Sequence, residues 1–146
     1  MRKICALMLL VTALLSHPLA AQQAQDFGEY VVHFNAFNAN QISPAVAQQY
    51  GIQRSSTRAL LNITVLSKVL QNPAAATHAK VTATARNLSG QIREIEIREV
   101  KEQGAIYYLG QLRVRNEETF DFTVNVVPDG EKEPFVVKFR QQFFTD

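Results

Sequence analysis

The sequence predicts an all-β protein, an antiparallel sandwich of about seven strands with one short helix. Three observations support this fold class. Apolar and polar residues alternate with a period of two over most of residues 29–143, and turn-forming residues interrupt the alternation at intervals of about 8 to 12 residues. Helices do not alternate with the strands, as they would in a parallel sheet. Together these observations indicate an immunoglobulin-like architecture.

The first predicted strand covers residues 29–37. Its core-facing positions are uniformly apolar: Tyr30, Val32, Phe34 and Ala36. Because successive side chains of a strand point to opposite faces, His33 and Asn35 are expected on the other face, pointing outward or lying under a covering loop. The strand therefore presents two polar side chains outside the core.

A helix of at most two turns is expected next, over residues 45–50. Ser43 can cap it, Pro44 suits its first position, and Gly51 can end it. A helix this short is marginal in water on its own. Val46 and Tyr50 lie four residues apart on one helix face, so they are expected to pack against the strands.

Six further strands are expected, over residues 58–66, 79–86, 91–102, 106–114, 120–127 and 135–143. The composition of the charged third segment also suits a helix, but its Ile and Val residues make a poor helical stripe, so a strand is favoured. Gly110 lies on an apolar strand face, which indicates a bulge or a close approach of other atoms.

The last two strands form the clearest hairpin, with turn chemistry at residues 128–130. Alternating aromatic residues follow the turn. We expect this set to pack in the core and in the final strand: Phe135, Phe139, Phe143 and Phe144.

Residues 1–21 have the pattern of a secretory signal peptide. Arg2 and Lys3 make the start positive, residues 4–15 are almost uninterruptedly apolar, and small side chains end the segment. The apolar run is shorter than the roughly 20 residues that cross a bilayer, which disfavours a retained membrane anchor. We expect cleavage after Ala21, with Ala20 as the alternative. The product is a single domain over residues 22–146, located in the periplasm without stable membrane insertion.

Cleavage changes the composition. The full chain has 15 basic and 13 acidic residues, and the loss of Arg2 and Lys3 leaves 13 of each, a formal charge of zero. Net charge therefore gives no support to nucleic-acid binding. Met1, Cys5 and Met8 are lost as well, which excludes disulfides, thiolate nucleophiles and sulfur ligands for copper from the mature chain. No cofactor is expected.

No motif predicts an enzyme. The two histidines after the signal peptide lack the close spacing of a zinc site, and no serine lies in the glycine-flanked turn of a hydrolase nucleophile. Glu94 and Glu96 share a strand face, on which cross-strand partners such as Arg113 or Arg115 are expected to neutralise them. We therefore expect no catalytic residues and no metal site.

Several segments of the first third resemble a known family: YVVHFNAFN at residues 30–38, ISPAVA at 42–47, YGI at 50–52, RS at 54–55 and LLNI at 60–63. They look like the uncharacterised proteobacterial domain-of-unknown-function family 4426, and the likeness extends through the mature chain. The resemblance implies a small periplasmic β-rich domain. It carries over no established activity, cofactor or catalytic residue.

The same region contains the candidate binding patch, made of His33, Asn35, Asn38 and Arg54 beside the short helix. The alternative is structural: the two asparagines satisfy turn backbone, and Arg54 pairs with an acid such as Glu29.

The leading functional hypothesis is a non-catalytic module that binds an envelope protein, through strand addition at a sheet edge or through this patch. Binding of a small ligand or a hard metal at His33 is the second hypothesis, and an enzyme is the third.

Overall fold

The computed structural model describes residues 23–69 and 75–146. The predicted signal peptide lies outside the described residues. The elements in chain order are β1 (Gln23–Asp26), β2 (Tyr30–Asn38), the 3-10 helix η1 (Ala39–Gln41), α1 (Pro44–Tyr50), β3 (Arg58–Ser67), β4 (Ala75–Ala76), β5 (Ala79–Asn87), β6 (Ile92–Ile95), β7 (Ile97–Glu102), β8 (Ala105–Arg113), β9 (Glu118–Pro128) and β10 (Phe135–Phe143). Within the described ranges, no helix is long and apolar enough to cross a membrane.

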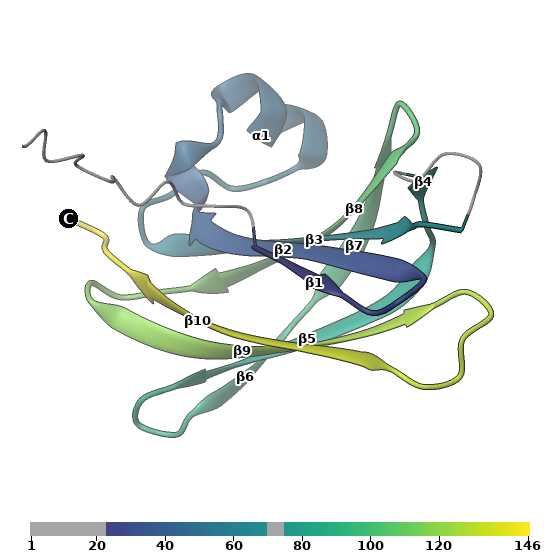
Figure 1. The fold of residues 1–146 in the computed structure, drawn as a ribbon. Coiled ribbons are helices and arrows are strands. Elements are labelled where there is room, and N and C mark those ends of the chain that lie inside the picture. The colour runs from purple at the N-terminus through teal and green to yellow at the C-terminus, as the bar shows by residue number, and fades with distance from the viewer. Residues whose placement is uncertain (1–22, 70–74) are drawn as a thin grey trace, which may run out of the picture.

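Two antiparallel sheets pack face to face as an open sandwich (Figure 1). The first sheet has the strand order β1-β2-β3-β8-β7, with β4 paired to β3, and the second has the order β10-β9-β5-β6. Helix α1 lies on the outer side of the first sheet, away from the second (Figure 1). The all-β sandwich predicted from the period-two pattern is therefore confirmed.

The predicted number of strands is wrong, because the described residues contain ten strands and not seven. β1 has no apolar alternation and all four of its residues are exposed, so its pairing with β2 could not be predicted from a pattern. β4 has only 2 residues. The charged segment 91–102 is extended, as predicted, and not helical. It is interrupted at Glu96 and forms two strands instead of one. β6 pairs with β5 in the second sheet, and β7 pairs with β8 in the first.

The core between the sheets is apolar and rich in aromatic rings. Phe34 of the first sheet lies 4.9 Å from Phe139 of the second, measured between ring centroids. Phe139 in turn stacks on Phe122 at 4.8 Å. Such aromatic pairs contribute about 0.5–1.5 kcal/mol beyond the burial of their area, so these rings join the two sheets.

The prediction for the C-terminal phenylalanines is correct for three of the four. Phe135, Phe139 and Phe143 pack in or against the core. Phe144 is 58% exposed and was assigned to the core wrongly. β10 ends at Phe143, which points inward, so the following side chain is directed away from the core.

Gly110 makes room for the crossing of the chain from one sheet to the other. Its Cα partner on β7 is Ile97, the first residue after the break at Glu96. A Cβ atom on Gly110 would lie 2.4 Å from Cγ2 of Ile95 and 2.8 Å from Cδ1 of Ile97. The close approach predicted at this position is confirmed.

Candidate functional site

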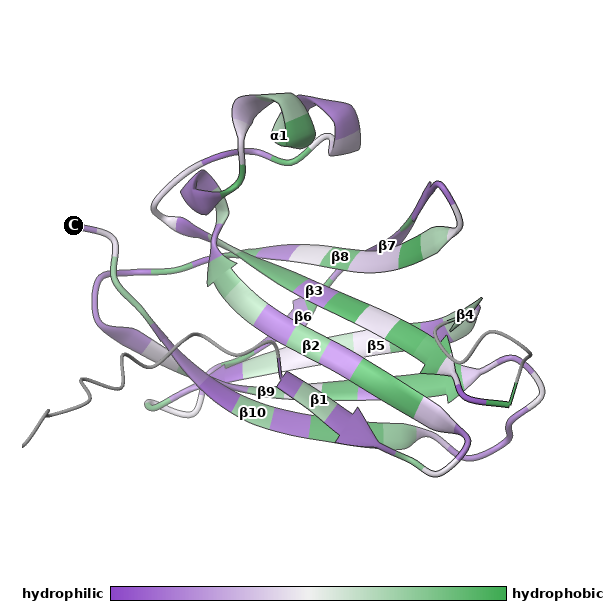
Figure 2. Ribbon diagram, turned by 45° about the horizontal axis from the view of Figure 1, so that its top comes forward, coloured by the Kyte–Doolittle hydropathy of each residue, from purple (hydrophilic) through white to green (hydrophobic). Residues whose placement is uncertain are grey.

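Helix α1 and the loop after it cover part of the outer face of the first sheet (Figure 2). The predicted capping is present: Oγ of Ser43 accepts a hydrogen bond from the Val46 amide at 3.3 Å, and Gly51 has a φ of 63° at the C-cap. Ala47 is the helix residue buried against the strands, whereas Val46 is 38% exposed. The expected packing is therefore correct for Tyr50 and wrong for Val46, which lies at the rim of the contact.

Polar contacts from β7 and β8 hold this cover in place. The guanidinium of Arg98 donates to the carbonyl of Tyr50, and Nε2 of Gln49 donates to Glu102 at 2.9 Å. Gln111 makes a pair of bonds with the backbone of Gln53: its Oε1 accepts at 3.3 Å and its Nε2 donates at 3.1 Å. These contacts satisfy backbone groups near the end of the helix and fix its position over the sheet.

A cleft of about 350 Å³ lies between the cover and the sheet. Its lining is apolar or aromatic with one exception, Asn62 of β3. The lining residues are Phe37, Ile42, Val46, Tyr50, Ile52, Leu60, Asn62, Tyr107 and Leu109. Apolar walls with a few placed polar groups are typical of binding sites, and they usually enclose about 300–1,000 Å³.

A row of polar side chains continues from the cleft along β2 and β3. Asn62 is the Cα partner of Asn35, and His33 is the partner of Thr64. Oδ1 of Asn62, Oδ1 of Asn35 and Nδ1 of His33 are buried and have no hydrogen-bond partner among the described residues. More than about 90% of buried polar groups in proteins pair with a protein group or an ordered water, so each of these three atoms calls for a partner such as a water molecule or a bound ligand. We name Asn62, Asn35 and His33 the polar row.

The structure divides the predicted patch into two parts. His33 and Asn35 belong to the polar row. Asn38 donates to the carbonyls of Ser56 at 2.8 Å and Phe144 at 2.9 Å, and Arg54 donates to those of Ile42 at 2.7 Å and Asn40 at 3.0 Å. Both side chains tie backbone segments together. The alternative of a pair between Arg54 and Glu29 is wrong, because the guanidinium donates to carbonyls of the segment before α1.

The ionisable side chains that line the cleft are the two tyrosines, Tyr50 and Tyr107. The pKa of the Tyr50 hydroxyl lies above its ordinary value because the hydroxyl is partly desolvated and lies near the carboxylate of Glu102. Tyr50 is thus neutral at physiological pH. Within the described part of the chain, no three His, Asp or Glu side chains are grouped as metal ligands.

The carboxylates of the charged segment do not make the expected cross-strand pairs. Glu94 lies opposite Thr84 in the second sheet, so the break at Glu96 separates it from Arg113. Glu99 binds His78 at 3.3 Å and lies 3.6 Å from Lys101. Burial alone would raise the pKa of Glu99, but the hydrogen bond and charge of His78, with smaller contributions from Lys101 and Tyr108, lower it overall.

Asn62 and the cleft itself were not predicted. Asn62 lies in a strand with apolar residues on both faces, so nothing distinguished it from a tolerated surface polar residue. Tyr107 and Leu109 come from a strand more than 40 positions away, and only the pairing of β3 with β8 brings them to the helix. The sequence did contain one indication of the cleft: both faces of β3 are largely apolar, which predicts that other residues cover the outer face of this sheet.

Comparison with known proteins places the chain in a family. The family model described as "Domain of unknown function (DUF4426)" matches residues 24–146. The chain belongs to this family. A solved DUF4426 family protein from Pseudomonas aeruginosa PAO1 is 34% identical, with a TM-score of 0.74 over 88% of this chain and 98% of that one. The resemblance predicted from the first third is therefore confirmed.

More distant solved structures share the fold. FetP from uropathogenic Escherichia coli strain F11, expressed recombinantly in the periplasm, is 10% identical with a TM-score of 0.60, over 84% of this chain and 93% of that one. A copper-bound variant of FetP is 11% identical with a TM-score of 0.58, over 86% and 97%. Identity this low supports the fold alone. The curated proteins contain no match to this chain.

Proposed function

We propose that this protein is an exported, non-catalytic interaction module of the periplasm, and that the cleft under α1 holds an apolar side chain of a partner protein. The observation that carries the proposal is the cleft itself, whose apolar walls end at the unpartnered Oδ1 of Asn62. Its position in the periplasm rests on the signal-peptide pattern of residues 1–21.

The polar row supports a protein segment as the occupant. A buried acceptor without a donor costs about 1–3 kcal/mol, and a bound group that supplies the donor recovers that free energy. Asn62 and Asn35 present two such oxygens side by side across β2 and β3. A protein segment can place one large side chain in the cleft while its backbone N–H groups donate to these oxygens. Large side chains that fill such pockets supply most of the binding free energy in many interfaces.

Photocrosslinking in living cells tests the interaction. The crosslinking residue p-benzoylphenylalanine replaces Val46, which is 38% exposed at the cleft, or Val136, which is 39% exposed on β10 of the second sheet. We expect a discrete adduct with one envelope protein from the Val46 position and none from Val136. Absence of an adduct at Val46, or the same adducts from both positions, would contradict the proposal.

Cell fractionation tests the location separately. Osmotic shock should release the protein, and its N-terminal residue should be Gln22, which follows the expected cleavage site. Full-length protein that retains Met1 in the cytoplasmic fraction would contradict export and leave the binding of the cleft to be judged on its own.

A further inference from the structure

A second hollow, unrelated to the cleft, lies where β8 ends. It measures about 470 Å³ and is lined by Thr57, Arg93, Arg113, Val114 and Arg115. The three arginines come from two sheets, because Arg93 belongs to β6 whereas Arg113 ends β8 and Arg115 follows it. Arg58, the first residue of β3, does not line the hollow but is the Cα partner of Arg113, beside it on the same face of the first sheet. We name these four residues the arginine cluster.

The arginine cluster has more positive charge than its surroundings neutralise. Directly opposed like charges on neighbouring strands are destabilising, and Arg58 and Arg113 are so placed. Among the described residues, Arg58, Arg113 and Arg115 form no ion pair through their guanidinium groups. A domain with equal numbers of basic and acidic residues has therefore concentrated unpaired cations at one end.

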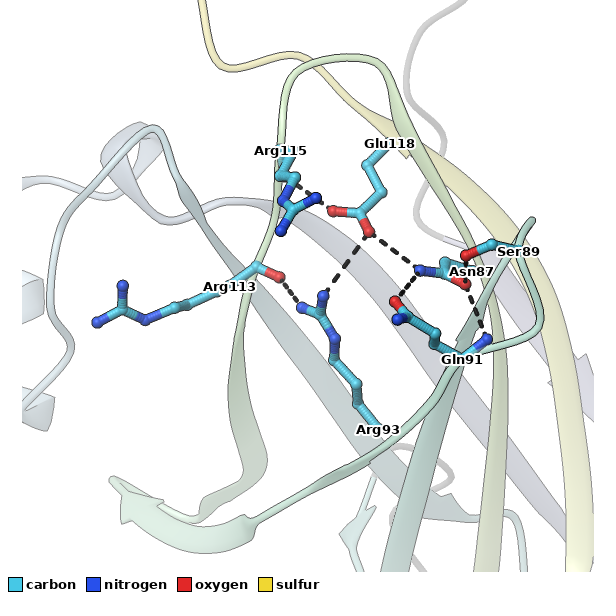
Figure 3. A network of polar contacts seen from close by, with 7 residues as sticks. All are labelled: Asn87, Ser89, Gln91, Arg93, Arg113, Arg115 and Glu118. Atoms are coloured by element: carbon cyan, nitrogen blue, oxygen red, sulfur yellow. Dashed lines mark hydrogen bonds and ion pairs between the residues drawn. The ribbon is translucent and has the colours of Figure 1, made fainter.

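The nearby carboxylate of Glu118 is already engaged. Its Oε2 accepts from the backbone amide of Arg115 at 2.9 Å, and its Oε1 accepts from Nδ2 of Asn87 at 3.4 Å (Figure 3). Oε1 also lies 3.8 Å from the guanidinium of Arg93. The single negative charge of Glu118 can neutralise the positive charge of Arg93 and no more. The positive charges of Arg113 and Arg115 are therefore not neutralised by Glu118.

Arg93 is held rigidly, which gives the hollow a fixed wall. It donates to the carbonyl of Arg113 at 2.6 Å, and its guanidinium lies 5.4 Å from the ring centroid of Phe120. In Figure 3 the guanidinium of Arg93 points toward Glu118, whereas that of Arg113 points away from it. The hollow is thus lined by one fixed arginine, Arg93, and by two arginines that form no ion pair among the described residues, Arg113 and Arg115.

We propose that the arginine cluster binds a phosphate group. Guanidinium groups present donors in a planar fork that matches the oxygens of phosphate, and charge-assisted bonds of this kind are about twice as strong as neutral ones. Arg113 and Arg115, the two arginines without ion pairs that line the hollow, match the two negative charges of a phosphate monoester. The phosphate can belong to a lipid headgroup or to a small soluble ester, because both present the same oxygens to the hollow.

The test measures binding of pyrophosphate, inorganic phosphate and vesicles of phosphatidic acid or phosphatidylcholine to the purified protein at low ionic strength. Arg113→Gln with Arg115→Gln removes the exposed pair. Lys138→Gln removes one positive charge from the exposed outer face of β10 and serves as the control. We expect the double variant to bind the phosphate probe at least about tenfold more weakly than wild type, and the control to match wild type.

The two sources of phosphate give different results. Binding of phosphatidic acid vesicles without binding of soluble phosphates identifies a lipid headgroup, and the reverse identifies a small ester. The proposal is overturned if no phosphate probe binds to the wild type, or if the control loses as much affinity as the double variant. Unchanged chemical shifts in the core of the double variant establish that it is folded.

Discussion

The two faces of the first sheet belong to the same strands but are built differently. On the inner face, Leu61 and Ile63 are fully buried in a continuous apolar core with the second sheet. On the outer face, their neighbours Leu60 and Asn62 line the cleft, and buried polar atoms of the polar row have no hydrogen-bond partner in the described part of the chain. The inner face buries apolar area, whereas unpaired buried polar atoms of the outer face cost free energy that a bound group with hydrogen-bond donors would recover. This difference is the reason for proposing the outer face as the binding surface.

The largest contrast should come from neighbouring leucines of β3. Leu61→Ala removes a side chain that is 0% exposed in the core and should cost about 2–5 kcal/mol of unfolding free energy. Leu60 is 2% exposed but borders the cleft, so the space left by Leu60→Ala joins the cleft and its cost should be at least about 1 kcal/mol smaller. Urea unfolding measures both. Equal losses would show that the two faces are packed alike.

The inner face should also resist added volume. Gly110→Ala places a Cβ atom 2.4 Å from Ile95 and 3.1 Å from the carbonyl of Glu96, so we expect a loss of about 1–3 kcal/mol in urea unfolding. Ile95→Ala removes the side chain that causes the closest contact, and in its background the glycine substitution should cost less. Additive costs in the double variant would argue against this contact.

The outer face should instead tolerate an apolar substitution. Asn62→Leu removes an unpartnered buried oxygen and should leave stability unchanged or raise it by up to about 1 kcal/mol. Asn125→Leu, on the outer face of β9, controls for the higher strand propensity of leucine. A loss of stability in Asn62→Leu but not in the control would mean that Asn62 makes an essential structural bond.

The smallest effect concerns the outer face of the second sheet. Arg140 binds Asp121 through two bonds of 2.7 and 2.9 Å, and these hold the pKa of Asp121 below 3.8. A carboxyl whose folded pKa is lowered stabilises the protein above its unfolded pKa, and this stabilisation is lost as the pH falls through the folded pKa. The melting temperature of Asp121→Asn should therefore fall less on acidification than that of wild type.

Glu133→Gln, which removes a carboxylate from the exposed turn before β10, controls for the change of charge. Parallel acid profiles for wild type and Asp121→Asn would show that the pair contributes nothing measurable, as many exposed ion pairs do.

The sequence predicted features that depend on local patterns. The inward set on β2, the caps at Ser43 and Gly51, and the close approach at Gly110 follow from alternation, hydrogen-bonding capacity and the absence of a side chain. His33 and Asn35 were recognised as polar side chains outside the core. The break at Glu96 was not predictable, because an extended segment has the same alternation of apolar and polar residues whether it stays in one sheet or crosses to another.

The sites themselves depend on pairing between distant strands. The cleft requires β8 beside β3 under a helix, and the arginine cluster requires the ends of β3, β6 and β8 to meet. Neither arrangement leaves a local pattern in the sequence. Asn38 and Arg54 were included in the patch because a polar side chain beside a loop has the same sequence pattern whether it binds a ligand or the backbone.

The most direct measurement is a two-dimensional amide NMR titration of the purified protein with N-acetyl-phenylalanine amide, a neutral mimic of a partner side chain. We expect chemical-shift changes confined to the cleft, at Phe37, Leu60, Asn62 and Leu109, and their loss when Val46→Asp places a charge at the rim. Val136→Asp should leave them intact. Shifts on β10 instead, or no shifts at millimolar concentrations, would contradict the assignment of the cleft as the binding site.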